Sequence, residues 1–511
     1  MFEKYLMLII YFAVLIGLSY IASKQVKNLK DYFTGGKSLG YLVAAFSTQA
    51  TGESAWLLLG LTGMGALVGV SAYWIVVGEV IGVAIAWFVM AQRFKKLTDL
   101  YDSITMTDYL VSRFRPTTNT LRLVAAFSLS IFVLIYISAQ IDATGSAFER
   151  FLGWDYYLGA IIGFVIVVIY CVMGGFLAVA WTDMFQGAVM LLCLCLLPIV
   201  AYFMLADSDN IITGLQAIDP NLLNISGAYD FNLMGIMSIL GMLFIGIGFL
   251  GSPQIFARFI AIRDKEELNK GRWVAVVFTF LVGTSAVTIG IIGRYIFTSV
   301  GVDPEATLGN GGQNVLPNLV EHTFPPLIVG LYVAAVLSAI MSTVSSLLIL
   351  ASGAITNDFY RKIINPELRG KSAARISRYV TIGLAIVALG IALSVAILSP
   401  DRTIFWFVIF GWSGIAATFC PMVILSLFWK NYTASGAIAS MIVGFISIPF
   451  FKFAAPNIDG IGQYFVALES LPPAFCASLI AGYLVCKIMP NQSINEDYAI
   501  DLQSIHSQAT D

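Results

Sequence analysis

The chain has 511 residues, of which 59% are hydrophobic and 11% are charged. A soluble globular protein is about 25% charged, so this composition excludes an ordinary soluble domain. The net charge of −2 gives no basis for binding nucleic acid. Apolar runs of about 20 residues, each long enough to cross a bilayer, recur from end to end. We therefore predict an all-α polytopic membrane protein.

The apolar runs predict thirteen transmembrane helices in a single transmembrane domain, residues 1–490. Their approximate ranges are 5–22, 39–65, 70–91, 121–144, 156–173, 180–203, 233–257, 273–297, 324–355, 376–398, 403–428, 433–453 and 464–489. The basic residues flanking the first run come after it, which favours a retained helix over a signal peptide. Residues 491–511 are polar and are expected to form a short, disordered cytoplasmic tail.

The distribution of positive charge predicts the orientation in the membrane. Four loops hold 21 of the 28 Lys and Arg residues: 23–38, 92–122, 258–272 and 356–378. The two long loops between them, 204–232 and 295–323, hold none. With thirteen helices, all four basic loops lie on one side of the membrane. By the positive-inside rule, the N-terminus then lies outside the cell and the C-terminus lies in the cytoplasm. We expect the protein to be located in the inner (plasma) membrane.

The second predicted helix contains the most informative stretch, residues 48–59, where Gly52 and Glu53 interrupt an apolar run. A glutamate at membrane depth is costly unless it faces protein, water or an ion. Gly52 allows the helix to break and to expose backbone carbonyls around a cavity. The stretch predicts a site for a small solute and a cation. Glu79, in the third helix, either pairs with a neighbour or takes part in a proton path.

Residues 174–183 predict a tight turn at Gly174 and Gly175, followed by Asp183 near the start of the next helix. Two interpretations of Asp183 stay open. In the first, its negative charge is stabilised by the helix dipole because it lies near a helix N-terminus. In the second, its carboxylate is a cation ligand at an inner gate on the cytoplasmic side.

The ninth predicted helix carries a cluster of hydroxyl groups. Ala339, Ser342 and Thr343 share one helix face, and Ser345 and Ser346 follow one turn later. Oxygen atoms of this kind, with carbonyls freed at a helix break, are ligands for a hard cation such as sodium. The alternative is that each hydroxyl bonds to a carbonyl of its own helix.

The helix pattern also suggests an internal symmetry. The broken segment 39–65 is followed by four helices, and the segment 233–257, interrupted at 246–253, is again followed by four. The two units, about 39–203 and 233–428, would form an inverted repeat with the binding site between them.

Three stretches resemble the sodium:solute symporter family, nearest to its sodium:proline symporter branch. They are Gly-Gly-Phe-Leu-Ala-Val-Ala-Trp-Thr-Asp at 174–183, Gly-x-Pro with Ala-Arg-Phe at 251–259, and Met-Ser-Thr-Val-Ser-Ser at 341–346. The similarity covers about residues 5–490 in matching order. At 51–56, where the proline branch has Ser-Asp-Met-Ser-Gly-Trp, this chain has Thr-Gly-Glu-Ser-Ala-Trp, which displaces a carboxylate by one residue.

The resemblance implies a five-plus-five inverted-repeat core with the leucine-transporter-like fold. It implies a sodium site formed by backbone oxygens of Ala50, Glu53 and Ala339 and the hydroxyls of Ser342 and Thr343. A second sodium site, present in some members, would be formed by Asp183, Ser342, Ser345 and Ser346. The substrate region would be formed by Trp56, Tyr136, Phe249 and Pro253.

These observations predict a symporter that couples sodium entry to import of a small polar solute, an amino acid such as proline or a relative of it. No nucleophile–base pair or metal constellation indicates an enzyme, and no obligate protein partner is implied. Two alternatives stay open: a proton-coupled amino-acid transporter using Glu53 or Glu79, and a transporter-like sensor that binds without flux.

Overall fold

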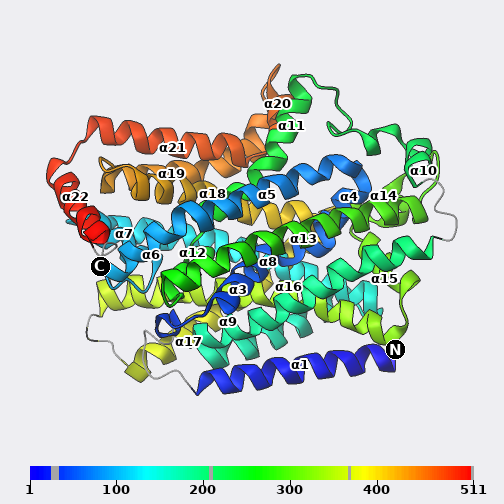
Figure 1. The fold of residues 1–511 in the computed structure, drawn as a ribbon, viewed down its shortest axis with the longest axis horizontal. Helices are drawn as coiled ribbons and strands as arrows, with labels where there is room; N and C mark the ends of the chain where they lie inside the picture. The colour runs from blue at the N-terminus through cyan, green and yellow to red at the C-terminus, as the bar shows by residue number, and fades with distance from the viewer. Residues whose placement is uncertain (25–33, 206–210, 366, 368–369, 508–511) are drawn as a thin grey trace.

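The computed structural model describes residues 1–24, 34–205, 211–365, 367 and 370–507. Over this range the chain is helical (Figure 1) and has no strand beyond an isolated parallel pairing of Leu39 with Ile262. The α-helices are α1 (Phe2–Ser23), α3 (Tyr41–Ala55), α4 (Thr62–Val68), α5 (Tyr73–Ile85), α6 (Ala91–Leu100), α7 (Met106–Phe114), α8 (Thr120–Leu152), α9 (Tyr156–Met204), α10 (Ile211–Ile218), α11 (Leu233–Phe244), α12 (Pro253–Ala261), α13 (Lys265–Phe297), α14 (Pro304–Leu308), α15 (Val315–Thr323), α16 (Pro326–Gly353), α17 (Gly370–Leu398), α18 (Ile404–Phe428), α19 (Ala434–Pro449), α20 (Gly462–Leu468), α21 (Leu471–Ile488) and α22 (Gln492–Ser507).

Short 3₁₀ or π-helical segments join or extend many of these helices. They are η1 (Gly35–Lys37), η2 (Trp56–Leu61), η3 (Gly69–Ala72), η4 (Ala86–Met90), η6 (Pro220–Leu223), η7 (Ile245–Leu250), η8 (Asn310–Gly312), η9 (Ala354–Ile364), η10 (Phe450–Ala454) and η11 (Ala455–Asn457). Segments of this kind inside long helices often mark functional positions; η2 follows directly after α3, and η7 lies within the predicted second break.

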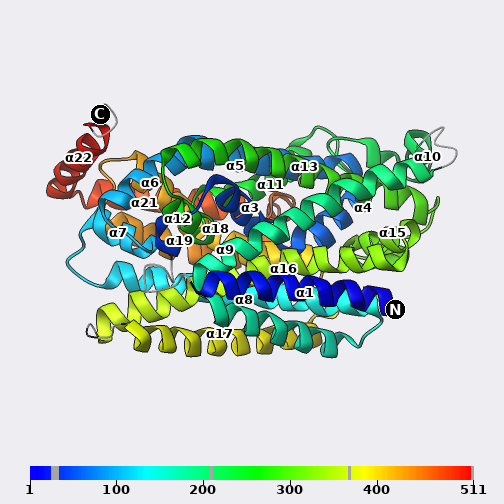
Figure 2. The same ribbon diagram turned by 60° about the horizontal axis from the view of Figure 1, so that its bottom comes forward.

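The long helices lie side by side in one bundle, with α16 and α18 at its centre. In the most apolar window of each of these two helices 83% of the residues are buried, against 28% for α1 and α17. Figure 2 shows α1 and α17 along one outer face of the bundle and α5 and α13 along the opposite face. The hydroxyl-rich segment of α16 is therefore enclosed by protein on all sides.

The ends of the bundle agree with the charge pattern. The segments that carry the basic loops, α6, α7 and α12, lie at the same end as α22 (Figure 1). The loops without Lys or Arg, which include α10, α14 and α15, lie at the other end, as does the N-terminus. The predicted separation of the basic loops from the loops without Lys or Arg is confirmed for these segments. Which end faces the cytoplasm stays a prediction, and part of the predicted basic loop 23–38 lies outside the described residues.

Eleven helical stretches among the described residues are long and apolar enough to cross a membrane. One of them, Tyr41–Leu100, has 60 residues. At 1.5 Å per residue it would measure about 90 Å as one helix, three times the thickness of a bilayer core. It is divided at Gly69, where φ is 62°. A shorter apolar helix, Tyr156–Ile169, precedes the kink of α9 at Gly175, where φ is 61°. The count of thirteen crossings stays a prediction.

Both predicted helix breaks are present, the first of them at a different residue. The sequence predicts the first break at Gly52, and the structure has it at Ser54, with φ 35° and ψ −167°. Gly52 is required for space instead, because a Cβ there would lie 2.6 Å from the ring of Phe249. The second break is confirmed: α11 gives way to η7, and a new helix begins at Pro253.

The prediction of a disordered tail is wrong for residues 492–507. They form α22, which packs against the end of the bundle. Tyr498 is buried, its hydroxyl donates to the carbonyl of Leu427 (3.0 Å), and its ring lies 3.3 Å from the guanidinium of Arg113. Arg115 pairs with Asp497 (2.5 Å) and Asp501 (3.2 Å). These contacts supply the burial that the tail's overall composition did not suggest.

Glycines bring the backbones of α5 and η7 into direct contact, and this packing gives a testable prediction. A Cβ on Gly246 would lie 2.0 Å from the carbonyl oxygen of Gly78. Since backbone cannot move aside cheaply, Gly246→Ala is expected to destabilise the protein by about 1–3 kcal/mol. Gly390→Ala in α17 is the matched control, because a Cβ there meets nothing within 4 Å. Thermal unfolding of both variants in detergent measures the difference, and equal melting temperatures would contradict the packing.

Candidate functional site

The site begins where the broken helix α3 meets the hydroxyl-rich helix α16. The Ser342 hydroxyl donates to the carbonyl of Ala50 (2.8 Å), and the Thr343 hydroxyl donates to the carbonyl of Thr51 (3.0 Å). These residues are fully buried. The sequence prediction that the two segments lie together is therefore confirmed by direct contacts.

Oxygen atoms from both helices converge at this contact. The carbonyl of Ala339 lies 3.1 Å from the hydroxyls of both Ser342 and Thr343, which also serve their own helix. Each of these hydroxyls thus contacts a carbonyl of its own helix and also a carbonyl of α3. Bonding within the helix therefore does not exclude a role as a cation ligand. The Glu53 carbonyl, the fifth predicted oxygen, accepts from the Trp56 amide. No hydrogen bond among the described residues joins it to the other four.

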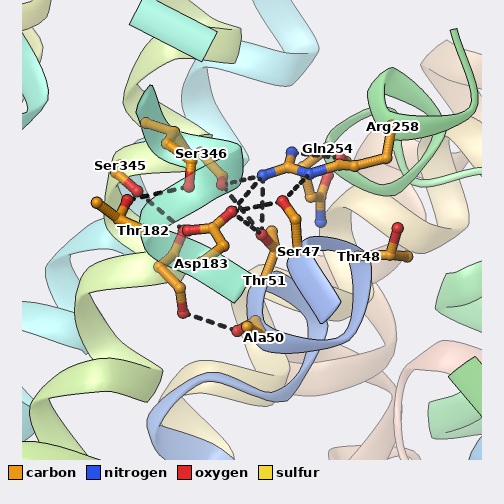
Figure 3. A network of polar contacts seen from close by, with 12 residues as sticks. Ser47, Thr48, Ala50, Thr51, Thr182, Asp183, Gln254, Arg258, Ser345 and Ser346 are labelled. Atoms are coloured by element: carbon orange, nitrogen blue, oxygen red, sulfur yellow. Dashed lines mark hydrogen bonds and ion pairs between the residues drawn. The ribbon is translucent and has the colours of Figure 1, made fainter. Parts of the chain in front are cut away.

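A second polar cluster lies beside the first and is centred on Asp183 (Figure 3). Its Oδ2 accepts hydrogen bonds from the Ser47 hydroxyl (2.6 Å) and from Arg258 Nη2 (3.0 Å), and lies 3.4 Å from the Thr51 hydroxyl. Arg258 also donates to Thr51 (2.9 Å) and to Ser346. Both charged side chains are at most 2% exposed. This is a buried ion pair. The surrounding hydrogen bonds help to offset the free-energy cost of removing its two charges from water.

The Asp183 cluster contradicts one of the two interpretations that the sequence leaves open, and the other, a cation ligand, stays a prediction. Asp183 does not lie at a helix N-terminus, since the second half of α9 begins at Gly175, two turns earlier. Of the residues predicted for a second sodium, Asp183 and Ser346 share the guanidinium of Arg258. The Ser345 hydroxyl bonds to the carbonyl of Ser342 in its own helix (3.1 Å). In this structure the guanidinium of Arg258 thus contacts two of the residues predicted for the second sodium, and the site itself stays a prediction.

Three of the four predicted substrate residues gather at the two helix breaks. The Trp56 indole donates to the Gly52 carbonyl (3.0 Å), and the Tyr136 hydroxyl donates to the Ser54 hydroxyl (3.2 Å). The Phe249 ring lies against Gly52. Pro253, the fourth, instead lines a cavity with Gln254, Arg258, Ser346 and Asp358. That cavity lies toward the end of the bundle that holds α7.

Sequence reasoning missed three residues of the site. Arg258 is a charged residue in a short apolar helix, which was a usable signal. Gln140 lies one turn after Tyr136 on α8. Its side-chain Oε1 accepts a hydrogen bond from the Ala55 N–H (3.1 Å), and its Nε2 donates to the Ser54 hydroxyl (3.4 Å). Trp412 of α18 stacks edge-on with Phe249, with ring centroids 5.3 Å apart, and donates to the Ile245 carbonyl (2.9 Å). Nothing in the local sequence distinguishes Trp412 from a packing residue.

Comparisons with known proteins agree with this architecture. Among curated proteins, the high-affinity proline transporter PutP of Bacillus subtilis (strain 168) is 34% identical over 497 residues, which is 96% of this chain and 99% of that protein. Sodium/proline symporter 2 of Staphylococcus saprophyticus is 33% identical over 95% of this chain and 93% of its own length. These relatives are transporters and not enzymes.

Solved structures share the fold. The substrate-bound, outward-open state of a Na⁺-coupled sialic acid symporter, described as revealing a novel Na⁺ site, superposes with a TM-score of 0.77. It is 20% identical and covers 96% of this chain and 99% of its own. MhsT in complex with L-phenylalanine has a TM-score of 0.52 at 15% identity, covering 88% and 98%. The sodium:solute symporter family model matches residues 32–444, and the chain belongs to this family.

Proposed function

We propose that this protein is a sodium-coupled symporter that imports a small amino acid, proline or a close relative, by alternating access. The contact between α3 and α16 carries the proposal. Main-chain carbonyls of a broken helix meet hydroxyls of an intact one in a fully buried position. Such half-helix sites near the midplane are where secondary transporters bind ions and solutes.

The sodium would be held by oxygens of Ala50, Glu53, Ala339, Ser342 and Thr343. These are three carbonyls and two hydroxyls, without a carboxylate among the ligand atoms, so the set suits a monovalent cation. The hydroxyls can turn from the carbonyls they now contact toward an ion. Binding of the ion would then tie α3 to α16.

The solute would lie between the two helix breaks, next to Trp56, Tyr136 and Phe249. The aromatic rings offer an apolar wall for a compact side chain such as the ring of proline. Ser54 and Gln140 offer polar atoms beside it. Relatives named as proline transporters support this choice, and the displaced carboxylate at Glu53 is one feature in which this chain's site departs from the proline branch.

The driving force of one sodium ion is sufficient for concentrative uptake. At about 100 mV, one charge moving inward contributes about 2.3 kcal/mol. A sodium gradient of about tenfold adds about 1.4 kcal/mol. The two contributions permit solute accumulation on the order of several hundred-fold per ion. Because Arg258 already places a positive charge against Asp183 and Ser346, we assign one sodium to each cycle and none to the second position.

The proposal includes the membrane arrangement. Thirteen crossings follow if Tyr41–Leu100 counts as two and the short helix Tyr156–Ile169 counts as one. The broken units α3–η2–α4 and α11–η7–α12 would occupy equivalent positions in a five-plus-five inverted repeat. The end with the basic segments would face the cytoplasm, and the N-terminus would lie outside the plasma membrane.

Uptake into proteoliposomes tests the function. With a panel of labelled small amino acids, proline included, we expect initial uptake of at least one of them to be about tenfold faster with an inward sodium gradient than with potassium. Uptake that ignores sodium would contradict the proposal. Saturable binding without flux would instead favour a sensor.

A further inference from the structure

A cavity lies between α12, α16, η9 and the start of α7, and none of the proposed sodium ligands lines it. It holds about 590 Å³ of space, open solvent at its mouth included, which is the size of a small-molecule pocket. Ser346, Leu350 and Ala354 line it at intervals of one helical turn. These eight residues of helix measure about 12 Å. The cavity therefore runs along one helix face, from the buried Arg258 toward the partly exposed Thr105, which precedes α7.

Gln254 lines this cavity, and its side-chain amide has no partner. Gln254 is 1% exposed, and neither its Oε1 nor its Nε2 has a hydrogen-bond partner among the described residues. Its main-chain carbonyl accepts from Arg258 (2.7 Å), which places it beside the Asp183 cluster (Figure 3). An unpaired buried donor or acceptor costs free energy, and most such groups in native proteins are paired. The amide thus indicates a ligand that supplies both an acceptor and a donor.

The charged groups that line the cavity are, by contrast, already paired. At its inner end Arg258 forms the ion pair with Asp183 (3.0 Å). Near its mouth Asp358 pairs with Arg122 (3.3 Å) and accepts a hydrogen bond from the Thr105 hydroxyl (3.3 Å). These charges do not require a counter-ion from solution. The group that lacks a partner is the neutral amide of Gln254.

We propose that this cavity is a second binding site for the amino acid, occupied after the solute leaves the position between the two helix breaks and before it reaches the cytoplasm. This inference rests on the proposed function. An amino-acid zwitterion complements an unpaired amide, because its carboxylate accepts from Nε2 and its ammonium group donates to Oε1. Leu129, Ile349 and Phe419 form apolar wall around the rest of the solute. Such a wall suits a compact side chain better than a cluster of waters, because each buried water needs several polar partners.

Pro253 connects the two solute positions along the chain. It lines this cavity and not the position next to Trp56, Tyr136 and Phe249. It is the first residue of α12, directly after the second break, and Gln254 follows it. Phe249 lies just before the same break, in η7. A movement at this break therefore changes one contact of each position together, as transfer of the solute from the first to the second requires.

Equilibrium binding of labelled proline to the purified full-length protein tests the second site. In a sodium-free potassium buffer the wild type should still bind proline, because the cavity contains no proposed sodium ligand. Gln254→Met keeps the length of the side chain without its amide and should weaken this binding at least about tenfold. Gln216→Met, at an exposed position of α10, should leave it unchanged. No binding without sodium, or equal affinity in Gln254→Met, would overturn the proposal.

The unpaired amide also has an effect on stability that involves no ligand. Gln254→Met removes a buried donor and acceptor at nearly constant volume, so the ligand-free variant should melt at the wild-type temperature or above it. Gln140→Met is the matched comparison, because its amide bonds to Ala55 and Ser54, and it should melt several degrees lower. An equal fall in both variants would show that the protein itself satisfies Gln254 and would overturn the site.

Failure of the second site and failure of transport give different results. Ala257→Cys introduces a thiol into the cavity. Its alkylation by N-ethylmaleimide, followed by mass spectrometry, should slow several-fold in saturating proline without sodium. Protection of this thiol without any sodium-driven proline uptake would contradict the transport function and leave the binding site. Sodium-driven uptake with an unchanged alkylation rate would contradict the second site alone.

Discussion

Replacing Ser342 and Thr343 together by alanine is expected to abolish sodium-driven uptake while the protein still folds. The double variant removes two of the five oxygens proposed to hold the ion. Each hydrogen bond or ligand contact to a charged group contributes about 1.5–3 kcal/mol. The apparent affinity for sodium should therefore fall by at least about 100-fold. Uptake measured over a wide sodium range gives this shift.

Folding should survive because the backbone of α16 does not depend on these hydroxyls. They bond to carbonyls of Ser338 and Ala339 that already belong to the helix. Ser352→Ala is the matched control, since it removes a buried hydroxyl that bonds to Ile349 in the same helix (3.1 Å). Full sodium dependence in the double variant, or an equal loss in the control, would argue against a cation site at the α3–α16 contact.

The parts of this site that could be predicted from sequence are those encoded locally. The hydroxyl cluster 342–346 lies on an apolar helix, and its spacing alone places Ser342 and Thr343 on one face. The basic loops likewise mark one end of the bundle through composition. Hydropathy, charge and helical period are properties of neighbouring residues, so they need no knowledge of the fold.

The parts that could not be predicted depend on contacts between distant segments. The break at Ser54 is held by Tyr136 and Gln140 of α8, and the sequence offers only Gly52 as the obvious breaker. The partner of Asp183 is Arg258, 75 residues away. The C-terminal helix is an intermediate case. Tyr498, Leu502 and Ile505 recur at helical spacing, a signal that low average hydropathy conceals.

The ion pair of Asp183 and Arg258 leads to the second prediction with a large effect. Asp183→Asn would remove the carboxylate that pairs with the buried Arg258 guanidinium. Loss of one partner of a buried pair costs about 3–5 kcal/mol. The remaining positive charge would also lie 2.9 Å from the Thr51 hydroxyl, next to the proposed sodium ligands, and would repel the ion. We expect Asp183→Asn to lower the melting temperature strongly and to abolish sodium-driven uptake.

A double-mutant cycle separates the ion pair from a sodium ligand. Asp183→Asn combined with Arg258→Gln removes both charges. The loss of unfolding free energy in the double variant should therefore be smaller than the sum of the losses in the two single variants, by about 0.5–3 kcal/mol. Asp155→Asn, at the exposed N-cap of the same helix, is the control for loss of a carboxylate and should change little.

The sodium dependence of the wild type completes the argument. Because the guanidinium of Arg258 contacts Asp183 and Ser346, where the second sodium is predicted, uptake should rise hyperbolically with sodium, with a Hill coefficient of about one. A wild-type coefficient well above one that falls to one in a folded Asp183→Asn variant would make Asp183 a sodium ligand. Arg258 would then have to withdraw from Asp183 and Ser346 during the cycle, and the pairing in this structure would be one stage of it.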